Sequence, residues 1–145
     1  MAVLSLLVAL AAIGVAAWAL VMAWPQGKDT AQPTAESNQK VCTAFETVAR
    51  AVQLQTHADL GPDPIAQEAV ASNARLSLIG GGEFLLSRLD DQTPPDLADA
   101  VRSFANNLDE IGINALAGAT NDDTQQAARL RAGEADRNKI ADLCK

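Results

Sequence analysis

The sequence contains no tyrosine, one histidine and only five phenylalanine and tryptophan residues. Stacking on sugars or on nucleic-acid bases needs aromatic side chains, so this scarcity argues against such sites. The net charge of −7 also opposes binding to nucleic acid or to an anionic lipid surface. The sequence contains a single histidine, His57, so it offers few candidates for metal ligands or for a general base. We therefore expect no enzymatic activity, no metal and no cofactor.

Charge is absent from the first 24 residues, because all 18 acidic and all 11 basic residues follow Trp24. Crossing about 30 Å of hydrocarbon takes about 20 apolar residues, so residues 1–24 are predicted to form a transmembrane helix that ends at Pro25. A cleaved signal peptide is the alternative, and Ala17–Ala19 is similar to a cleavage site. The apolar run is longer than a signal-peptide core, and no basic residue precedes it. We therefore expect an uncleaved signal anchor in the plasma membrane, spanning it once.

One face of this predicted membrane helix consists of small residues at alternating spacings of three and four. Small side chains let helices approach closely in lipid, where no hydrophobic force drives association. We expect this face to dock on an integral membrane partner or on a second copy of the chain. The alternative is chance, because alanine is abundant throughout. The face comprises Ala2, Ser5, Ala9, Ala12, Ala16, Ala19 and Ala23.

Beyond the anchor, the sequence predicts a spacer and one helical domain. Residues 25–37 contain two prolines, one glycine and no large apolar side chain, which is typical of a flexible tether. Residues 38–145 fit a single small domain with helices over 38–58, 63–89, 93–118 and 122–144. Short connections make neighbouring helices antiparallel, so we expect an up-down four-helix bundle. The expected helix N-caps are Ser37 or Asn38, Asp63, Thr93, and Asp122 or Asp123.

Apolar residues recur with helical spacing in each of these four stretches. The third has the most regular register, and the fourth is interrupted by Glu134 and Arg137. Gly61 and Gly118 lie where the first and third helices are expected to end. The residues expected to face the core are Val41, Phe45, Val48, Val52, Ile65, Ala69, Leu76, Ile79, Leu85, Leu86, Leu97, Val101, Phe104, Leu108, Ile111, Ala127, Leu130, Ile140 and Leu143.

The chain has two cysteines, Cys42 near the start of the first helix and Cys144 at the end of the fourth. In an even-numbered up-down bundle these positions lie at the same end, so we predict a disulfide between them. Two buried free thiols are the alternative. Because disulfides persist in oxidising compartments, the bond predicts a soluble domain outside the cytoplasmic membrane and an N-terminus inside it.

Three consecutive glycines, Gly80, Gly81 and Gly82, lie inside the second predicted helix, although each glycine costs roughly 1 kcal/mol there relative to alanine. They indicate close helix packing, a break in the helix, or a groove where a ligand or partner meets bare backbone.

Arginine recurs on the alanine-rich helices. These arginines either pair with the many acidic residues or form a rim around a partner surface. His57 is expected to be solvated near a helix C-terminus, and the adjacent Asp90 and Asp91 supply too few oxygens for calcium. The arginines are Arg50, Arg75, Arg88 and Arg102.

Three segments, Val41–Phe45, Ala74–Leu78 and Asp99–Ala105, resemble alanine-rich single-pass membrane proteins of mycobacteria and related actinobacteria. The resemblance implies an envelope protein with an exported helical domain. Most such proteins have no known function, so it assigns no site residue.

These features predict a non-catalytic accessory or assembly subunit of a cell-envelope membrane complex, such as a transporter or respiratory assembly. Its membrane helix and exported helical domain would both contact the partner. The alternative is a membrane-tethered binding protein for a lipid or small apolar ligand. Such a binding protein should contain an apolar pocket lined by Ile79, Phe84 and Phe104. A docking subunit should have a full core and an exposed apolar patch.

Overall fold

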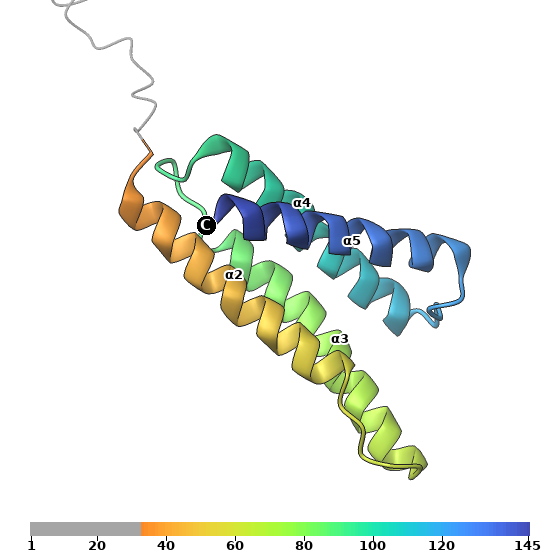
Figure 1. The fold of residues 1–145 in the computed structure, drawn as a ribbon. Helices are drawn as coiled ribbons and strands as arrows, with labels where there is room; N and C mark the ends of the chain where they lie inside the picture. Colours follow the sequence, from red (N-terminus) through yellow and green to blue (C-terminus); the bar gives the residue numbers. More distant parts are fainter. Residues whose placement is uncertain (1–32) are drawn as a thin grey trace, which may run out of the picture. The chain divides into compact units, whose positions relative to one another are not determined.

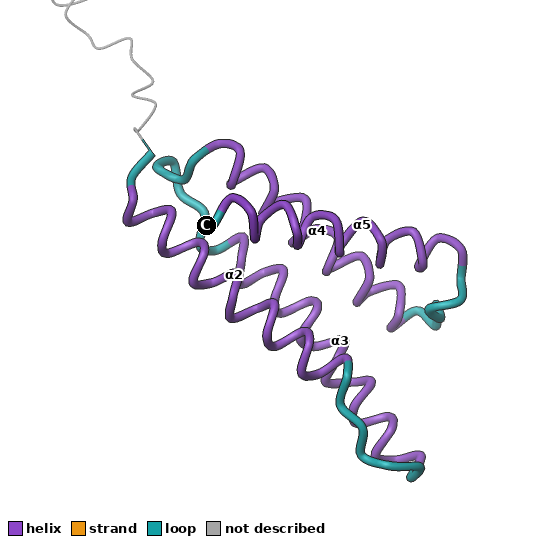
Figure 2. The backbone as a smooth tube through the Cα atoms, in the orientation of Figure 1, coloured by secondary structure: helices purple, strands orange, loops and turns teal. Residues whose placement is uncertain are grey.

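The computed structural model describes residues 33–145, and every regular element in this range is an α-helix. The helices are α2 (Ala35–Thr56), α3 (Pro64–Leu86), α4 (Pro95–Leu116) and α5 (Thr124–Leu143), joined by short loops (Figure 1, Figure 2). The prediction of an all-α domain built from four helices is therefore confirmed.

The predicted membrane helix over residues 1–24, with its small-residue face from Ala2 to Ala23, lies outside the described residues. Within residues 33–145, no helix combines the length and the apolar character needed to span a membrane. The anchor and the single-pass topology therefore stay predictions.

Side-chain caps fix the start of three helices by accepting hydrogen bonds from free backbone N–H groups. Asp63 accepts from the backbone nitrogens of two residues in the first turn of α3 at 2.8 and 3.0 Å, and Asp123 does the same for α5 at 2.9 and 3.1 Å. Both caps were expected. In α2 the cap is Thr34, whose hydroxyl accepts from the nitrogen of Ser37 at 3.1 Å. The prediction of Ser37 or Asn38 as the cap was therefore wrong.

The start of α4 also differs from the prediction, because Pro94 occupies the cap position and makes no side-chain hydrogen bond there. The hydroxyl of Thr93, which was expected to cap α4, instead accepts from the backbone nitrogen of Asp90 at 3.1 Å. The glycines after α2 and α4 agree with the prediction. Gly61 and Gly118 have φ angles of +82° and +97°, which other residues rarely adopt.

The core is centred on α4, whose five predicted inward residues are all buried. Within it, the rings of Phe45 and Phe104 meet edge to face at a centroid distance of 5.8 Å. α2 also follows its predicted register, except that Val52 is only partly buried. The principal core side chains are Val41, Phe45, Val48, Leu78, Leu85, Leu97, Val101, Phe104, Leu108, Ile111 and Ile140.

The register predicted for α3 was wrong along its first half. Ile65 and Leu76 are 82 % and 69 % exposed, and no residue of α3 before Leu78 is buried. α3 packs instead through Leu78, the glycine pair after it and Leu85. In α5 only Ile140 is buried as expected, whereas Leu130 and Leu143 are more than one-third exposed.

The four helices form an open arrangement. α3 packs extensively on α4, α2 packs on α3 and α5 packs on α4, but α2 and α5 touch only slightly. Figure 1 shows α2 and α5 diverging from the end of the domain where the C-terminus lies. At that end the predicted disulfide is present, joining Cys42 to Cys144 with Cα atoms 5.6 Å apart. The domain is therefore covalently closed at one end and open along one side.

Candidate functional site

The open side of the domain contains a cleft of about 1030 Å³ between α2 and α5, with α3 and α4 as its floor. The floor is apolar. α2 and α5 supply the two walls through small and apolar side chains such as Ala49, Val52 and Leu130. The floor side chains are Leu78, Phe104, Leu108 and Ile111, and Phe45 of α2 lies beside them.

Charged side chains lie along the two upper edges of the cleft walls, which we call its lips. α2 contributes Glu46 and Arg50, and α3 contributes Arg75, which donates to Glu68 at 2.9 Å. Both arginines were expected to pair with acids or to form a rim. Arg50 forms no ion pair with any residue in the 33–145 range.

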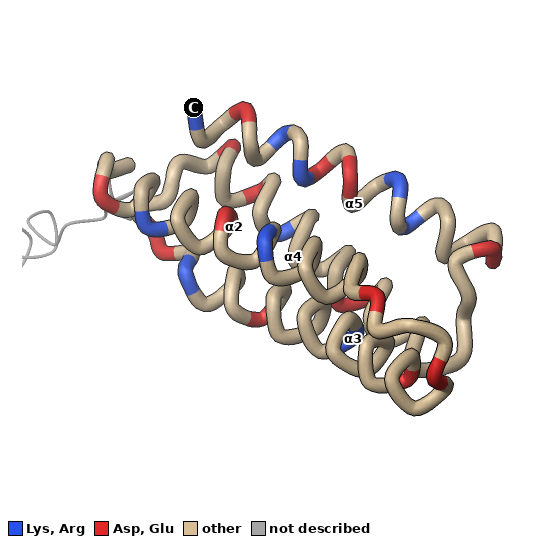
Figure 3. Tube along the Cα trace, turned by 60° about the horizontal axis from the view of Figure 1, so that its bottom comes forward, with Lys and Arg blue, Asp and Glu red and all other residues tan. Residues whose placement is uncertain are grey.

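The lip formed by α5 contains a forked ion pair. Arg137 donates to the two carboxylate oxygens of Glu134 at 2.9 and 2.7 Å. These hydrogen bonds lower the pKa of Glu134 and raise the pKa of Arg137. Figure 3 shows basic positions spaced along α5 among its acidic ones. Two parallel hydrogen bonds to Glu134 hold the Arg137 guanidinium in place beside the cleft.

His57 lies at the open end of the cleft, at the C-cap of α2. It is exposed, and its Nδ1 lies 3.0 Å from both the carbonyl oxygen of Gln53 and the hydroxyl of Thr56. These are local contacts at a helix end. Within residues 33–145 no three His, Cys, Asp or Glu side chains gather closely enough to hold a metal ion.

The glycine triplet lies outside this cleft. A Cβ atom on Gly81 would stand 2.7 Å from Cγ1 of Val48 in α2, and one on Gly82 would stand 2.7 Å from the carbonyl oxygen of Ala105 in α4. The alternative of close helix packing therefore describes Gly81 and Gly82, whereas Gly80 faces open space.

The pocket residues expected beside the triplet are also largely absent from the cleft. Only Phe104 lines it, whereas Ile79 contacts Gly112 and Phe84 stacks under the guanidinium of Arg88 at 4.3 Å. The expectation was wrong because α3 turns its glycine-containing face toward α2 and α4.

A buried carboxylate oxygen lies next to the triplet. Oδ1 of Asp109 is inaccessible to solvent and has no hydrogen-bond donor within the described chain. It lies against the Cα of Gly82, with no room for a side chain between them. Burial raises the pKa of Asp109, and the negative charge of Glu83 raises it further. The close α3–α4 contact therefore desolvates one oxygen of the Asp109 carboxylate without giving it a hydrogen-bond donor.

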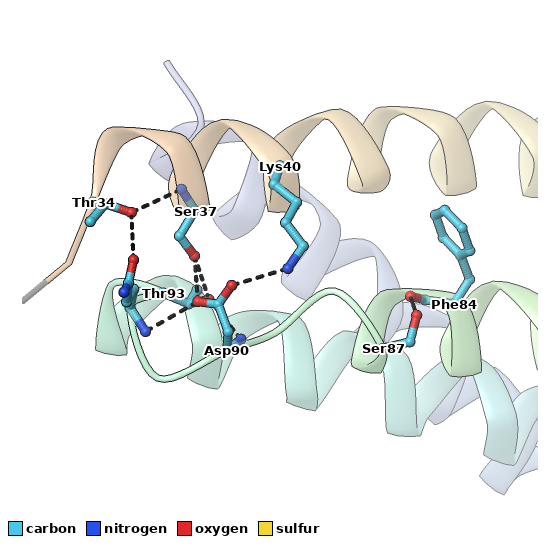
Figure 4. Close-up of polar contacts among 8 residues, drawn as sticks. Thr34, Ser37, Lys40, Phe84, Ser87, Asp90 and Thr93 are labelled. Atoms are coloured by element: carbon cyan, nitrogen blue, oxygen red, sulfur yellow. Dashed lines mark hydrogen bonds and ion pairs between the residues drawn. The ribbon is translucent and has the colours of Figure 1, made fainter. Parts of the chain in front are cut away.

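A polar cluster around Asp90 ties the start of α2 to the α3–α4 loop (Figure 4). Asp90 accepts from the hydroxyl of Ser37 at 2.6 Å, from Lys40 at 3.0 Å and from the hydroxyl of Thr93 at 3.1 Å. The hydrogen bond from Ser37 is the main reason that the pKa of Asp90 falls to about 2. Thr34 adds a backbone hydrogen bond to the carbonyl of Gln92 at 3.1 Å.

Sequence reasoning missed this cluster because its partners are far apart in the chain. The one local signal was the spacing of Asp90 and Thr93, which is typical of a turn closed by side chains. The cluster and the disulfide hold the same end of the domain, so that end is fixed while the opposite end of the cleft stays open.

No family model, curated protein or solved structure matches this chain. The candidate site therefore rests on its own geometry: a floor of apolar side chains, two helical walls and a few charged side chains at the lips.

Proposed function

We propose that this chain is a membrane-tethered, non-catalytic binding protein whose helical domain holds an elongated apolar molecule between α2 and α5. The observation that supports this function is the cleft of about 1030 Å³ with its apolar floor. Small-molecule sites typically occupy about 300–1,000 Å³, are lined mostly by apolar side chains and contain a few placed polar groups. The cleft combines an apolar floor with polar and charged side chains at its edges, and its volume is just above this range.

The location of the protein is part of the proposal. The uncharged run over residues 1–24 supports a membrane anchor, and the disulfide supports an oxidising compartment outside the plasma membrane. The tether would keep the cleft close to a source of apolar molecules.

Photoaffinity labelling of the full chain in nanodiscs of zwitterionic lipid tests this function. The probe is a long-chain alcohol with a photoreactive group in the middle of its chain. We expect labelled peptides to include the cleft side chains Val52, Leu78 and Leu130 in addition to the anchor. Labels confined to residues 1–24 would contradict the proposal.

A matched pair of variants shows whether the label reports occupancy of the cleft. Ala49→Phe places a ring in the cleft wall and should reduce labelling there several-fold. Ala51→Phe adds the same ring to an exposed position of α2 that does not line the cleft, and should leave labelling unchanged. Circular dichroism of both variants checks that the helices are retained. Equal labelling of the two variants would show that the probe does not enter the cleft.

A docking subunit of an envelope membrane complex is the second candidate, and exposed apolar side chains favour it. Leu54, Leu60 and Ile65 are 62 %, 65 % and 82 % exposed around the α2–α3 connection. A single exposed apolar residue is normal, whereas three within twelve residues of the chain favour an interface there. Native mass spectrometry of the full chain from nanodiscs tests docking between copies. A dimer that dissociates on Ile65→Glu supports this candidate, and a monomer at all concentrations contradicts docking between copies.

A further inference from the structure

The charges around the cleft differ from those of the rest of the domain. Residues 33–145 contain 17 of the 18 acidic residues and 10 of the 11 basic residues of the chain. The cleft is lined by three arginines but by only two glutamates. An otherwise acidic domain therefore has a small excess of positive charge at its apolar cleft, which favours an anionic group there.

We propose that the ligand is a single-chain amphiphile with a carboxylate head group, whose chain lies on the apolar floor and whose carboxylate binds Arg50. This inference rests on the proposed binding function. Arg50 is the cleft arginine that forms no ion pair within residues 33–145, whereas Arg75 and Arg137 each donate to a glutamate.

Arg50 is also placed to reach a ligand head group at the surface. It is exposed on the α2 lip, and Glu46, one helical turn earlier, makes no ion pair with it. A planar guanidinium receives a carboxylate through two parallel hydrogen bonds, which gives both strength and orientation. The side chain of Arg50 therefore offers the geometry that an acidic head group needs.

The length of the cleft agrees with an extended alkyl chain as its occupant. α2 and α5 are tied at one end of the domain by the disulfide, whose Cα atoms are 5.6 Å apart, and they diverge from that end (Figure 1). The lining of α2 from Phe45 to His57 extends about 18 Å at 1.5 Å per residue, which suits an extended chain lying along the floor.

Three photoreactive probes that differ only in the head group test this proposal on the full chain in zwitterionic nanodiscs. They are a long-chain carboxylate, the matching alcohol and the matching quaternary ammonium compound. We expect the carboxylate to label the cleft about tenfold more than the alcohol, and the ammonium compound to label it least. Raising the salt concentration should narrow the difference, because Arg50 is exposed.

Two arginine variants provide the matched control. Arg50→Gln should reduce the ratio of carboxylate to alcohol labelling from about ten to about one. Arg131→Gln removes an exposed arginine of α5 that does not line the cleft, and should leave this ratio unchanged. Equal labelling by the carboxylate and the alcohol in the unmodified chain would overturn the proposal of an acidic head group but would leave the proposal of apolar binding intact. Absence of cleft labelling by every probe would overturn both.

Discussion

Comparing alanine at Gly80 with alanine at Gly82 separates the effect of helix propensity on stability from the effect of helix packing. Alanine is favoured over glycine by about 1 kcal/mol in a helix interior, and this gain applies equally at Gly80 and Gly82. At Gly80 the new Cβ meets nothing within 4 Å, so Gly80→Ala should raise the free energy of unfolding by about 1 kcal/mol. At Gly82 the Cβ would meet the carbonyl oxygen of Ala105 at 2.7 Å, and a backbone oxygen cannot rotate away.

The difference between these two variants measures the α3–α4 contact alone, because the propensity gain cancels. Overpacking of a close contact costs about 1–3 kcal/mol, so Gly82→Ala should be less stable than Gly80→Ala by that amount. The assay is urea unfolding of the full chain in a non-ionic detergent, followed by circular dichroism. Equal stability of the two variants would refute the reasoning, since α3 and α4 would then not approach closely at Gly82.

Three further perturbations test the rest of the domain. Because the pKa of Asp90 is lowered to about 2 from 3.8, its contribution to stability is present above pH 3.8 and is lost as the pH falls toward 2. Asp90→Asn should remove that acid dependence in pH-dependent urea unfolding, while Asp91→Asn should retain it. Asp109 has the opposite effect on stability. Because its pKa is raised, the free energy of unfolding falls as the pH rises and the carboxyl group ionises. Asp109→Asn should therefore stabilise the domain more at pH 7 than at pH 3, and a larger stabilisation at pH 3 would show that the ionised carboxylate is not destabilising. Reducing the Cys42–Cys144 bond, which spans 102 residues, should lower the free energy of unfolding by up to about 4.7 kcal/mol, and urea midpoints unaffected by dithiothreitol would refute this.

The sequence predicted the helices and their caps where a local rule applied. α4 was predicted best, since its apolar residues from Leu97 to Ile111 keep a single register and all are buried. Asp63 was also recognised as a cap, because an aspartate before a proline satisfies free N–H groups by itself. Thr34 was missed as the cap of α2 because several nearby residues are equally good caps, and tertiary contacts with Gln92 select one of them.

Apolar periodicity gave wrong predictions of burial where a helix face has no neighbouring helix. Ile65 and Leu76 have helical spacing, but no other helix buries the first half of α3. Leu130 was expected in the core and instead lines the cleft, because α5 diverges from α2. Apolar spacing indicates which residues can be buried, but burial itself requires an element on the other side.

The sequence by itself determined the four helices, the disulfide pairing, the two glycine helix ends and the concentration of charge beyond residue 24. These features depend on residue type and on spacing along the chain. Only the tertiary structure decided that α2 and α5 separate, that Gly81 and Gly82 serve helix packing and that Arg50 borders an apolar cleft. Each of these depends on the direction in which one helix crosses another, which is set by side-chain packing between residues distant in the sequence.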